Sequence, residues 1–206
     1  LPASAALGNA IITDDLENAG PGWTAVRATD IQKGINNVYQ NSIFGYPYPG
    51  GDKTLKLADK ANPDTASYVI SGNKSIYFTN DPVKSGTENL SAMMTLPKDG
   101  SALEFKADKV YIARFRMRVI EKGAKLSITV RTWDAMDDWI TFQFNTDVKK
   151  GYAVKATGNL RLYDKAAIQK IGENDYEVAL RFAGVNTQGA DSYCYLMWDI
   201  AGTGGF

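Results

Sequence analysis

Three stretches between Val110 and Phe144 alternate strictly between apolar and polar residues. The apolar positions of the first are Tyr111, Ala113, Phe115, Met117 and Val119, set against Ile112, Arg114, Arg116 and Arg118. In the second, Leu126, Ile128 and Val130 alternate with Lys125, Ser127, Thr129 and Arg131, and in the third, Ile140, Phe142 and Phe144 alternate with Trp139, Thr141 and Gln143. A period of two is typical of strands that bury one face and expose the other. This stretch therefore predicts three strands lining one side of a core.

Further alternating segments indicate that the whole chain is built from strands. They are Lys74–Asn80, Leu90–Pro97, Asp175–Phe182 and Tyr193–Ile200, with shorter candidates at Lys53–Leu57 and Ser67–Ile70. No long segment shows the helical period, although Lys165–Asn174 could form one helical turn or an irregular crossing. Many short strands with frequent turn signals predict an all-β fold, an antiparallel two-sheet β-sandwich (jelly roll), with a barrel as the alternative.

The length of 206 residues fits one β domain. We expect a linker or trimmed N-terminal segment at residues 1–10 and a single β-sandwich domain at 11–206. The first residue, Leu1, is consistent with trimming or with removal of a signal peptide.

Composition excludes several functions. The chain has no histidine, which removes Ser-His-Asp and Cys-His catalysis and every imidazole zinc site. Its only cysteine, Cys194, lies in an apolar alternation and is expected to be a buried hydrophobe. Lys and Arg together number 23, as do Asp and Glu, so the net charge is zero and argues against nucleic-acid binding. No apolar run is long enough to span a membrane.

If the three central strands are neighbours, their polar sides form one face rich in arginine and aromatic residues. Arginine binds carboxylate or sulfate in a bidentate fork, and aromatic rings stack on sugar rings, so a ladder of arginines on this face would suit an acidic polysaccharide. The alternative is a solvated face whose arginines pair with Glu177 or Asp134. The predicted ligand-binding residues are Arg114, Arg116, Arg131, Trp133, Trp139, Gln143, Tyr193 and Tyr195.

Trp133 and Trp139 flank a loop with three aspartates, Asp134, Asp137 and Asp138. The two rings could clamp a sugar at the rim of a cleft, or one could cap the core while the acids shape a turn. Calcium binding is a third option, although the loop lacks the glycine and distal glutamate of an EF-hand.

Three segments resemble carbohydrate-binding modules of the galactose-binding-like jelly-roll group. They are DDLENAGPGW (Asp14–Trp23), SGNKSIYF (Ser71–Phe78) and LEFKADKVYIARFRMRV (Leu103–Val119). One departure is that WDI (Trp198–Ile200) stands where such modules commonly carry a pair of aspartates. The resemblance implies a structural calcium ion, for which Asp15, Glu17 and Asp199 are the candidate ligands if the terminal strands pair.

The leading hypothesis is a non-catalytic module that binds a polysaccharide or oligosaccharide. We expect it to be secreted or at the cell surface, and tethered to a catalytic domain or surface protein in its parent. Two alternatives stay open: a structural or adhesion module of a surface or phage-tail assembly, and a polysaccharide lyase acting on a uronate polymer. A glycosidase dyad among the loop aspartates depends on a carboxyl separation that the sequence does not determine.

Overall fold

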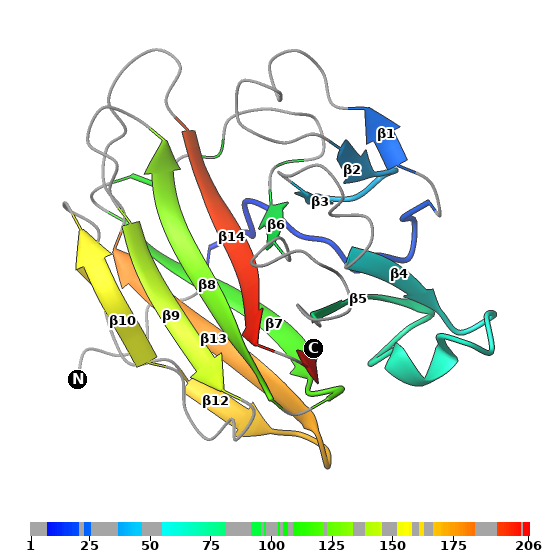
Figure 1. Cartoon of the computed structure of the whole chain (residues 1–206). Coiled ribbons are helices and arrows are strands. Elements are labelled where there is room, and N and C mark those ends of the chain that lie inside the picture. Colours follow the sequence, from blue (N-terminus) through cyan, green and yellow to red (C-terminus); the bar gives the residue numbers. More distant parts are fainter. Residues whose placement is uncertain are drawn as a thin grey trace.

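The largest unit of the fold is an eight-stranded sheet that spans the chain from its first strand to its fourteenth (Figure 1). A computed structural model describes residues 8–20, 23–25, 37–46, 55–80, 92–95, 97, 103, 105–106, 109–121, 123–133, 139–145, 152–157, 161–162, 167–183, 193–202 and 204–206. The strands of this sheet, in spatial order, are β1 (Trp23–Ala25), β2 (Asn37–Tyr39), β3 (Phe44–Tyr46), β6 (Ala92–Thr95), β14 (Tyr193–Gly202), β8 (Ala124–Trp133), β9 (Trp139–Asn145) and β10 (Tyr152–Thr157).

Two smaller sheets complete the described structure. A four-stranded sheet contains β11 (Arg161–Leu162), β12 (Ala167–Lys170), β13 (Asp175–Ala183) and β7 (Val110–Arg118), with β13 in the middle. A three-stranded sheet contains β4 (Leu55–Asp59), β5 (Lys74–Asn80) and β15 (Gly204–Gly205), with the short 3₁₀-helix η2 (Ala66–Tyr68) between β4 and β5. The pairings between the described strands are antiparallel, which confirms the predicted all-β antiparallel class.

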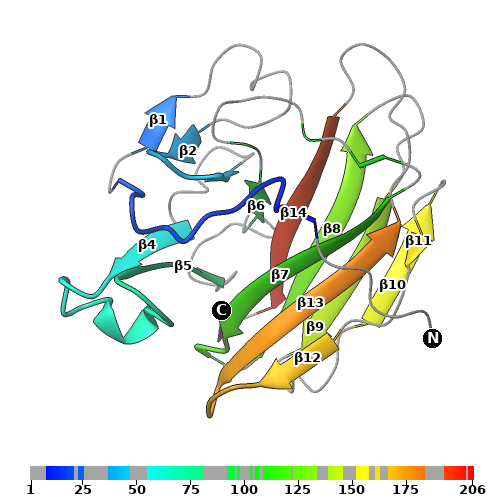
Figure 2. The ribbon, with the colours of Figure 1, turned by 180° about the vertical axis from the view of Figure 1, so that it is seen from behind.

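The core lies between the eight-stranded and four-stranded sheets, with β7 and β13 running behind β8, β9 and β14 (Figures 1 and 2). In the long strands β7, β8, β13 and β14, the described apolar positions of one parity face inward, as the alternation predicts. Leu126, Ile128 and Val130 of β8 are buried, and so are Val178 and Leu180 of β13. Alternation within one strand therefore assigned the buried face correctly on both sides of the core.

The expectation that the first two central strands are neighbours is wrong. β7 pairs along its full length with β13, from Val110 opposite Ala183 to Arg118 opposite Asp175, whereas β8 pairs with β9 and β14. Phe115 of β7 meets Trp198 of β14 edge-on across the core, with ring centroids 4.8 Å apart. The consecutive strands therefore lie on opposite sides of the core, because each buries its own apolar face against the other sheet.

Two local expectations are also corrected. Ser67 and Tyr68, expected in a strand over Ser67–Ile70, belong to η2, and residues 167–170, expected within a helical turn or irregular crossing, form β12. The C-terminal segment contains β15, and Phe206 is buried in the core. These segments are short, so the partner strand rather than the local period decides their conformation.

The three-stranded sheet is joined to the segment that follows β7 by backbone hydrogen bonds. The amides of Ile120 and Glu121 both donate to the Gly205 carbonyl, and the Gly205 amide donates back to Glu121. β15 is thereby bonded to β5 on one side and to the segment after β7 on the other. The end of β7, an edge strand of the four-stranded sheet, thus lies where the three sheets come together.

Candidate functional site

The arginines predicted to share a face with Trp139 belong to a different sheet. Arg114 and Arg116 lie on β7 and are exposed, whereas Trp139 lies on β9 in the eight-stranded sheet. Both arginines approach the same carboxylate, Glu177 of β13, at 3.4 Å. The pairing with Glu177 is the one that the alternative of a solvated, ion-paired face predicts. These two residues are therefore removed from the candidate glycan site.

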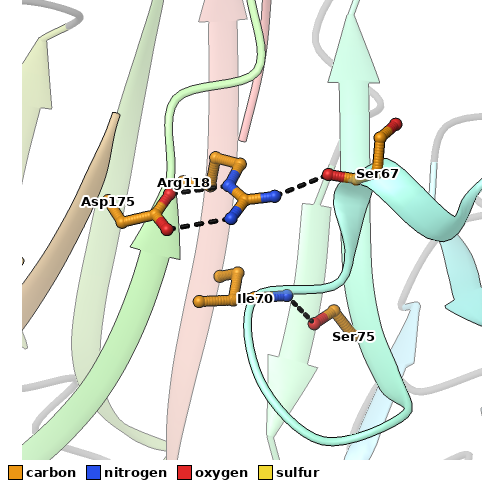
Figure 3. Close-up of polar contacts among 5 residues, drawn as sticks. All are labelled: Ser67, Ile70, Ser75, Arg118 and Asp175. Atoms are coloured by element: carbon orange, nitrogen blue, oxygen red, sulfur yellow. Dashed lines mark hydrogen bonds and ion pairs between the residues drawn. The ribbon is translucent and has the colours of Figure 1, made fainter. Parts of the chain in front are cut away.

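Arg118, the next arginine on β7, has a structural role (Figure 3). Its Nε and Nη2 donate to the two oxygens of Asp175 at 2.6 and 2.9 Å, and its Nη1 donates to the carbonyl of Ser67 in η2. The guanidinium lowers the pKa of the Asp175 carboxyl, and that hydrogen-bonded carboxylate raises the pKa of Arg118. This contact, which we call the Arg118 clip, holds η2 against the edge of the four-stranded sheet.

The other six predicted residues are brought together by strand register. Arg131 of β8 stands between Tyr195 of β14 and Trp139 of β9, and Trp133 stands opposite Tyr193. On the same side of β8, toward its start, Ser127 stands between Asp199 of β14 and Gln143 of β9. All these positions have the parity opposite to the buried Leu126, Ile128 and Val130, so they share the face of the sheet turned away from the core. We call this the outer face.

The structure describes the side chains of the outer face only in part. Ser127, Thr129, Thr141, Met197 and Asp199 are half-buried there, and the hydroxyls of Thr129 and Thr141 lie 3.0 Å apart. For the six predicted residues it gives backbone positions alone, and residues 134–138 with their three aspartates lie outside the described residues. The described part of the outer face thus offers hydroxyl groups and one carboxyl, and the register adds positions for one guanidinium, one amide and four aromatic rings.

Asp199 is an unusual group on this face. It lies in the interior of the eight-stranded sheet, between Ser127 of β8 and Ala92 of β6. Burial raises the pKa of its carboxyl to about 6, because a charged group loses hydration there. The carboxyl therefore titrates close to neutral pH.

The predicted metal ligands do not assemble. The Glu17 carboxylate accepts from the Asn73 amide at 2.7 Å and from Asn73 Nδ2 at 2.8 Å, which lowers its pKa, and Asp15 accepts from the Glu17 amide. Gly72, at φ +65°, makes that approach possible, because a Cβ there would collide with the Glu17 carboxylate. Asp199 lies on β14 of the eight-stranded sheet. Within the described part of the chain, no three acidic, histidine or cysteine side chains lie close enough together to hold a metal ion. The expected calcium ion stays a prediction without an assembled set of ligands.

A cavity that the sequence did not indicate lies at the junction of the three sheets. Its volume is about 140 Å³, and most of its wall is apolar. The described residues that line it are Leu16, Phe44, Tyr68, Ile70, Ser75, Ile76, Tyr77, Met93, Phe115, Arg116, Met117, Arg118, Ile120, Leu126, Trp198 and Phe206. These residues come from several strands and loops far apart in the chain, so no spacing in the sequence could have indicated that they lie together.

The chain matches no family model, no curated protein and no solved structure. The resemblance to carbohydrate-binding modules therefore rests on the sequence segments alone. None of the helices among the described residues is long and apolar enough to cross a membrane.

Proposed function

We propose that this chain is a non-catalytic carbohydrate-binding module, a two-sheet β-sandwich of the jelly-roll type, that binds a polysaccharide through its outer face. The observation that carries the proposal is the row formed by Tyr195, Arg131 and Trp139, with Tyr193 and Trp133 in the next row. A sheet face that gathers aromatic residues in neighbouring rows is suited to an extended chain of sugar rings. We further propose that the module is secreted or displayed at the cell surface, and that it is tethered to a catalytic domain in its parent protein.

The chemistry of the outer face fits sugars in two ways. Aromatic rings present wide apolar surfaces with a polar edge, which match the apolar faces and equatorial hydroxyls of pyranose rings. Amide, hydroxyl and guanidinium groups supply the donors and acceptors that fix the orientation of those hydroxyls. An open sheet face buries little ligand surface, so we expect a Kd between micromolar and millimolar, about −4 to −8 kcal/mol.

Because β7 and β8 lie in different sheets, the expected class of ligand changes from an acidic to a neutral polysaccharide. With Arg114, Arg116 and Arg118 on another sheet, Arg131 is the arginine that remains among the predicted residues of the outer face. A ladder of guanidinium groups was the reason to expect an acidic polymer. The register supports instead a neutral polysaccharide bound by stacking and hydrogen bonds.

Isothermal titration calorimetry against cellohexaose, xylan, mannan, laminarin, alginate and pectin tests this function. We expect heat with at least one neutral glycan, and at least tenfold weaker binding for Trp139→Ala. Arg114→Ala is the matched control, since Arg114 is an exposed residue on the other sheet, and it should bind like the unchanged protein.

Two results would overturn the proposal: no heat with any glycan of the panel, or equal losses in both variants. Light scattering completes the experiment. A stable dimer that Trp139→Ala dissociates would assign the outer face to assembly instead.

A further inference from the structure

We propose that Asp199 is a sugar-binding residue of the outer face, and that its carboxylate accepts hydrogen bonds from two adjacent hydroxyl groups of one sugar ring. This role rests on the proposed function and narrows the ligand that goes with it. The rings of the bound chain must keep a free pair of neighbouring hydroxyls, which a neutral 1,4-linked polysaccharide does and a 1,3-linked one does not.

The Asp199 carboxyl lacks a partner within the described part of the protein. It forms no hydrogen bond or ion pair with another described residue, although it is half-buried in the interior of the sheet. Burial is the cause that raises its pKa, and no hydrogen-bond donor offsets that rise. A buried polar group without a partner costs stability, so its presence in a folded protein calls for an explanation. A ligand that donates hydrogen bonds to the carboxylate would remove this cost.

Asp199 lies where a chain bound to the outer face can reach it. Strand β14 places Asp199 on the same side as Tyr195, about 13 Å further along the strand at the ordinary rise per residue. The two residues beside it in the register, Ser127 of β8 and Ala92 of β6, are small, which limits how far they can cover the carboxyl. A glycan that stacks on the position of Tyr195 and runs along β14 (Figure 1) therefore passes over Asp199.

The chemistry of a carboxylate selects the class of sugar. At pH 7.5 the Asp199 carboxyl is mostly ionised, so it only accepts hydrogen bonds. Its two oxygens can each accept one bond from neighbouring hydroxyls, and bonds to a charged acceptor are stronger than neutral ones. The inner rings of a 1,4-linked chain have free hydroxyls on the adjacent second and third carbons, whereas those of a 1,3-linked chain have none on adjacent ring carbons. A uronate polymer would bring a like charge to this position, which disfavours it.

Isothermal titration calorimetry at pH 7.5 with cellohexaose, xylohexaose, mannohexaose and laminarihexaose tests this role. We expect the unchanged protein to bind at least one of the three 1,4-linked chains, and to bind the 1,3-linked laminarihexaose at least tenfold more weakly. Asp199→Asn keeps the shape of the side chain but removes its charge, and should weaken binding of the 1,4-linked chain at least tenfold. Glu177→Gln is the matched control: it makes the same change on β13 of the four-stranded sheet, so its Kd values should not change.

Stability separates a binding role of Asp199 from a structural one. Asp199→Asn removes a buried charge, so at pH 7.5 it should unfold at a higher urea concentration than the unchanged protein while it binds the glycan more weakly. Asp199→Ser is the second variant, with the same expected loss of binding, should the amide fail to fold.

The outcomes that overturn this role differ from those that overturn the proposed function. Unchanged Kd values for the Asp199 variants, or binding of laminarihexaose as tight as that of the 1,4-linked chains, would overturn the role of Asp199 and leave glycan binding by the outer face standing. Absence of heat with these four oligosaccharides would also overturn it. Absence of heat with the larger glycan panel as well would overturn the proposed function too.

Discussion

At the scale of single residues, identical residue types on one strand have different roles because their partners differ. Arg114 and Arg116 approach Glu177 loosely from solvent, whereas Arg118 makes two short bonds to Asp175. The side chain of Arg118 is 28% exposed and that of Arg114 is 59% exposed. An ion pair that is partly shielded and bidentate contributes more than an exposed pair at long distance.

Asp199 gives a prediction about pH. The pKa of its carboxyl rises from 3.8 to about 6 on folding, so the folded chain holds this proton more tightly than the unfolded chain. The free energy of unfolding should therefore fall as pH rises from about 4 to about 6. The full cost, up to about 3 kcal/mol, is present above the folded pKa.

Urea unfolding of the unchanged chain and of Asp199→Asn at pH 4 and pH 7.5 measures this effect. The amide has no proton to lose, so the variant should be the more stable of the two at pH 7.5, and the difference should shrink at pH 4. Parallel pH profiles for the two proteins would contradict the role assigned to burial.

At the scale of elements, the alternation in β7, β8, β13 and β14 identified which side of each strand is buried. Parity is a property of one strand, so it is readable without knowing the neighbours. Parity does not specify the partner, and the assumption that β7 lies beside β8 followed only from their order in the chain. The same limit explains β12 and β15, whose conformations depend on pairing with β13 and β5.

The Arg118 clip gives a prediction at this scale. Arg118→Ala should cost about 1–3 kcal/mol of the free energy of unfolding, because it removes two charge-assisted bonds and leaves Asp175 without its cation. It should also speed hydrogen exchange at the amides of Tyr68 and Val69, which close η2. Chemical denaturation and exchange NMR measure the two effects.

Arg114→Ala, which removes an exposed pair, should cost about 0–1 kcal/mol and is the control. The lowered pKa of Asp175 means that the clip stabilises the fold above the unfolded pKa of that carboxyl. This contribution is lost as pH falls through the folded value. The difference between Arg118→Ala and the unchanged chain should therefore decrease in acid, and a constant difference would contradict the charge-assisted bond.

At the scale of the whole molecule, one cluster of buried side chains connects all three sheets. It includes Ile128 and Trp198 from the eight-stranded sheet, Val178 and Phe182 from the four-stranded sheet, and Leu55 from the three-stranded sheet. Trp198 also donates from Nε1 to the Thr95 hydroxyl at 2.9 Å, which satisfies its polar edge inside the core. Such continuity is expected of a chain that unfolds as one unit.

Cooperativity is the prediction that follows. Far-ultraviolet circular dichroism and tryptophan fluorescence should report the same denaturant midpoint, as expected for a single domain over residues 11–206. Ile128→Ala, at a fully buried position, should lower the free energy of unfolding by about 2–5 kcal/mol and shift both probes together. Separate transitions for the two probes, or a shift in only one, would show that the sheets unfold independently.

The sequence by itself determined the all-β class and the buried face of the long strands, because side-chain alternation is local and follows from backbone geometry. It also nominated Arg131, Trp133, Trp139, Gln143, Tyr193 and Tyr195, which the register later placed on one face. Only the tertiary structure decided that β7 pairs with β13, that Arg114 and Arg116 lie on a different sheet from Trp139, and that residues of all three sheets line one cavity. Strand pairing joins residues far apart in the chain, and the free energy that selects each partner comes from burial across the whole core.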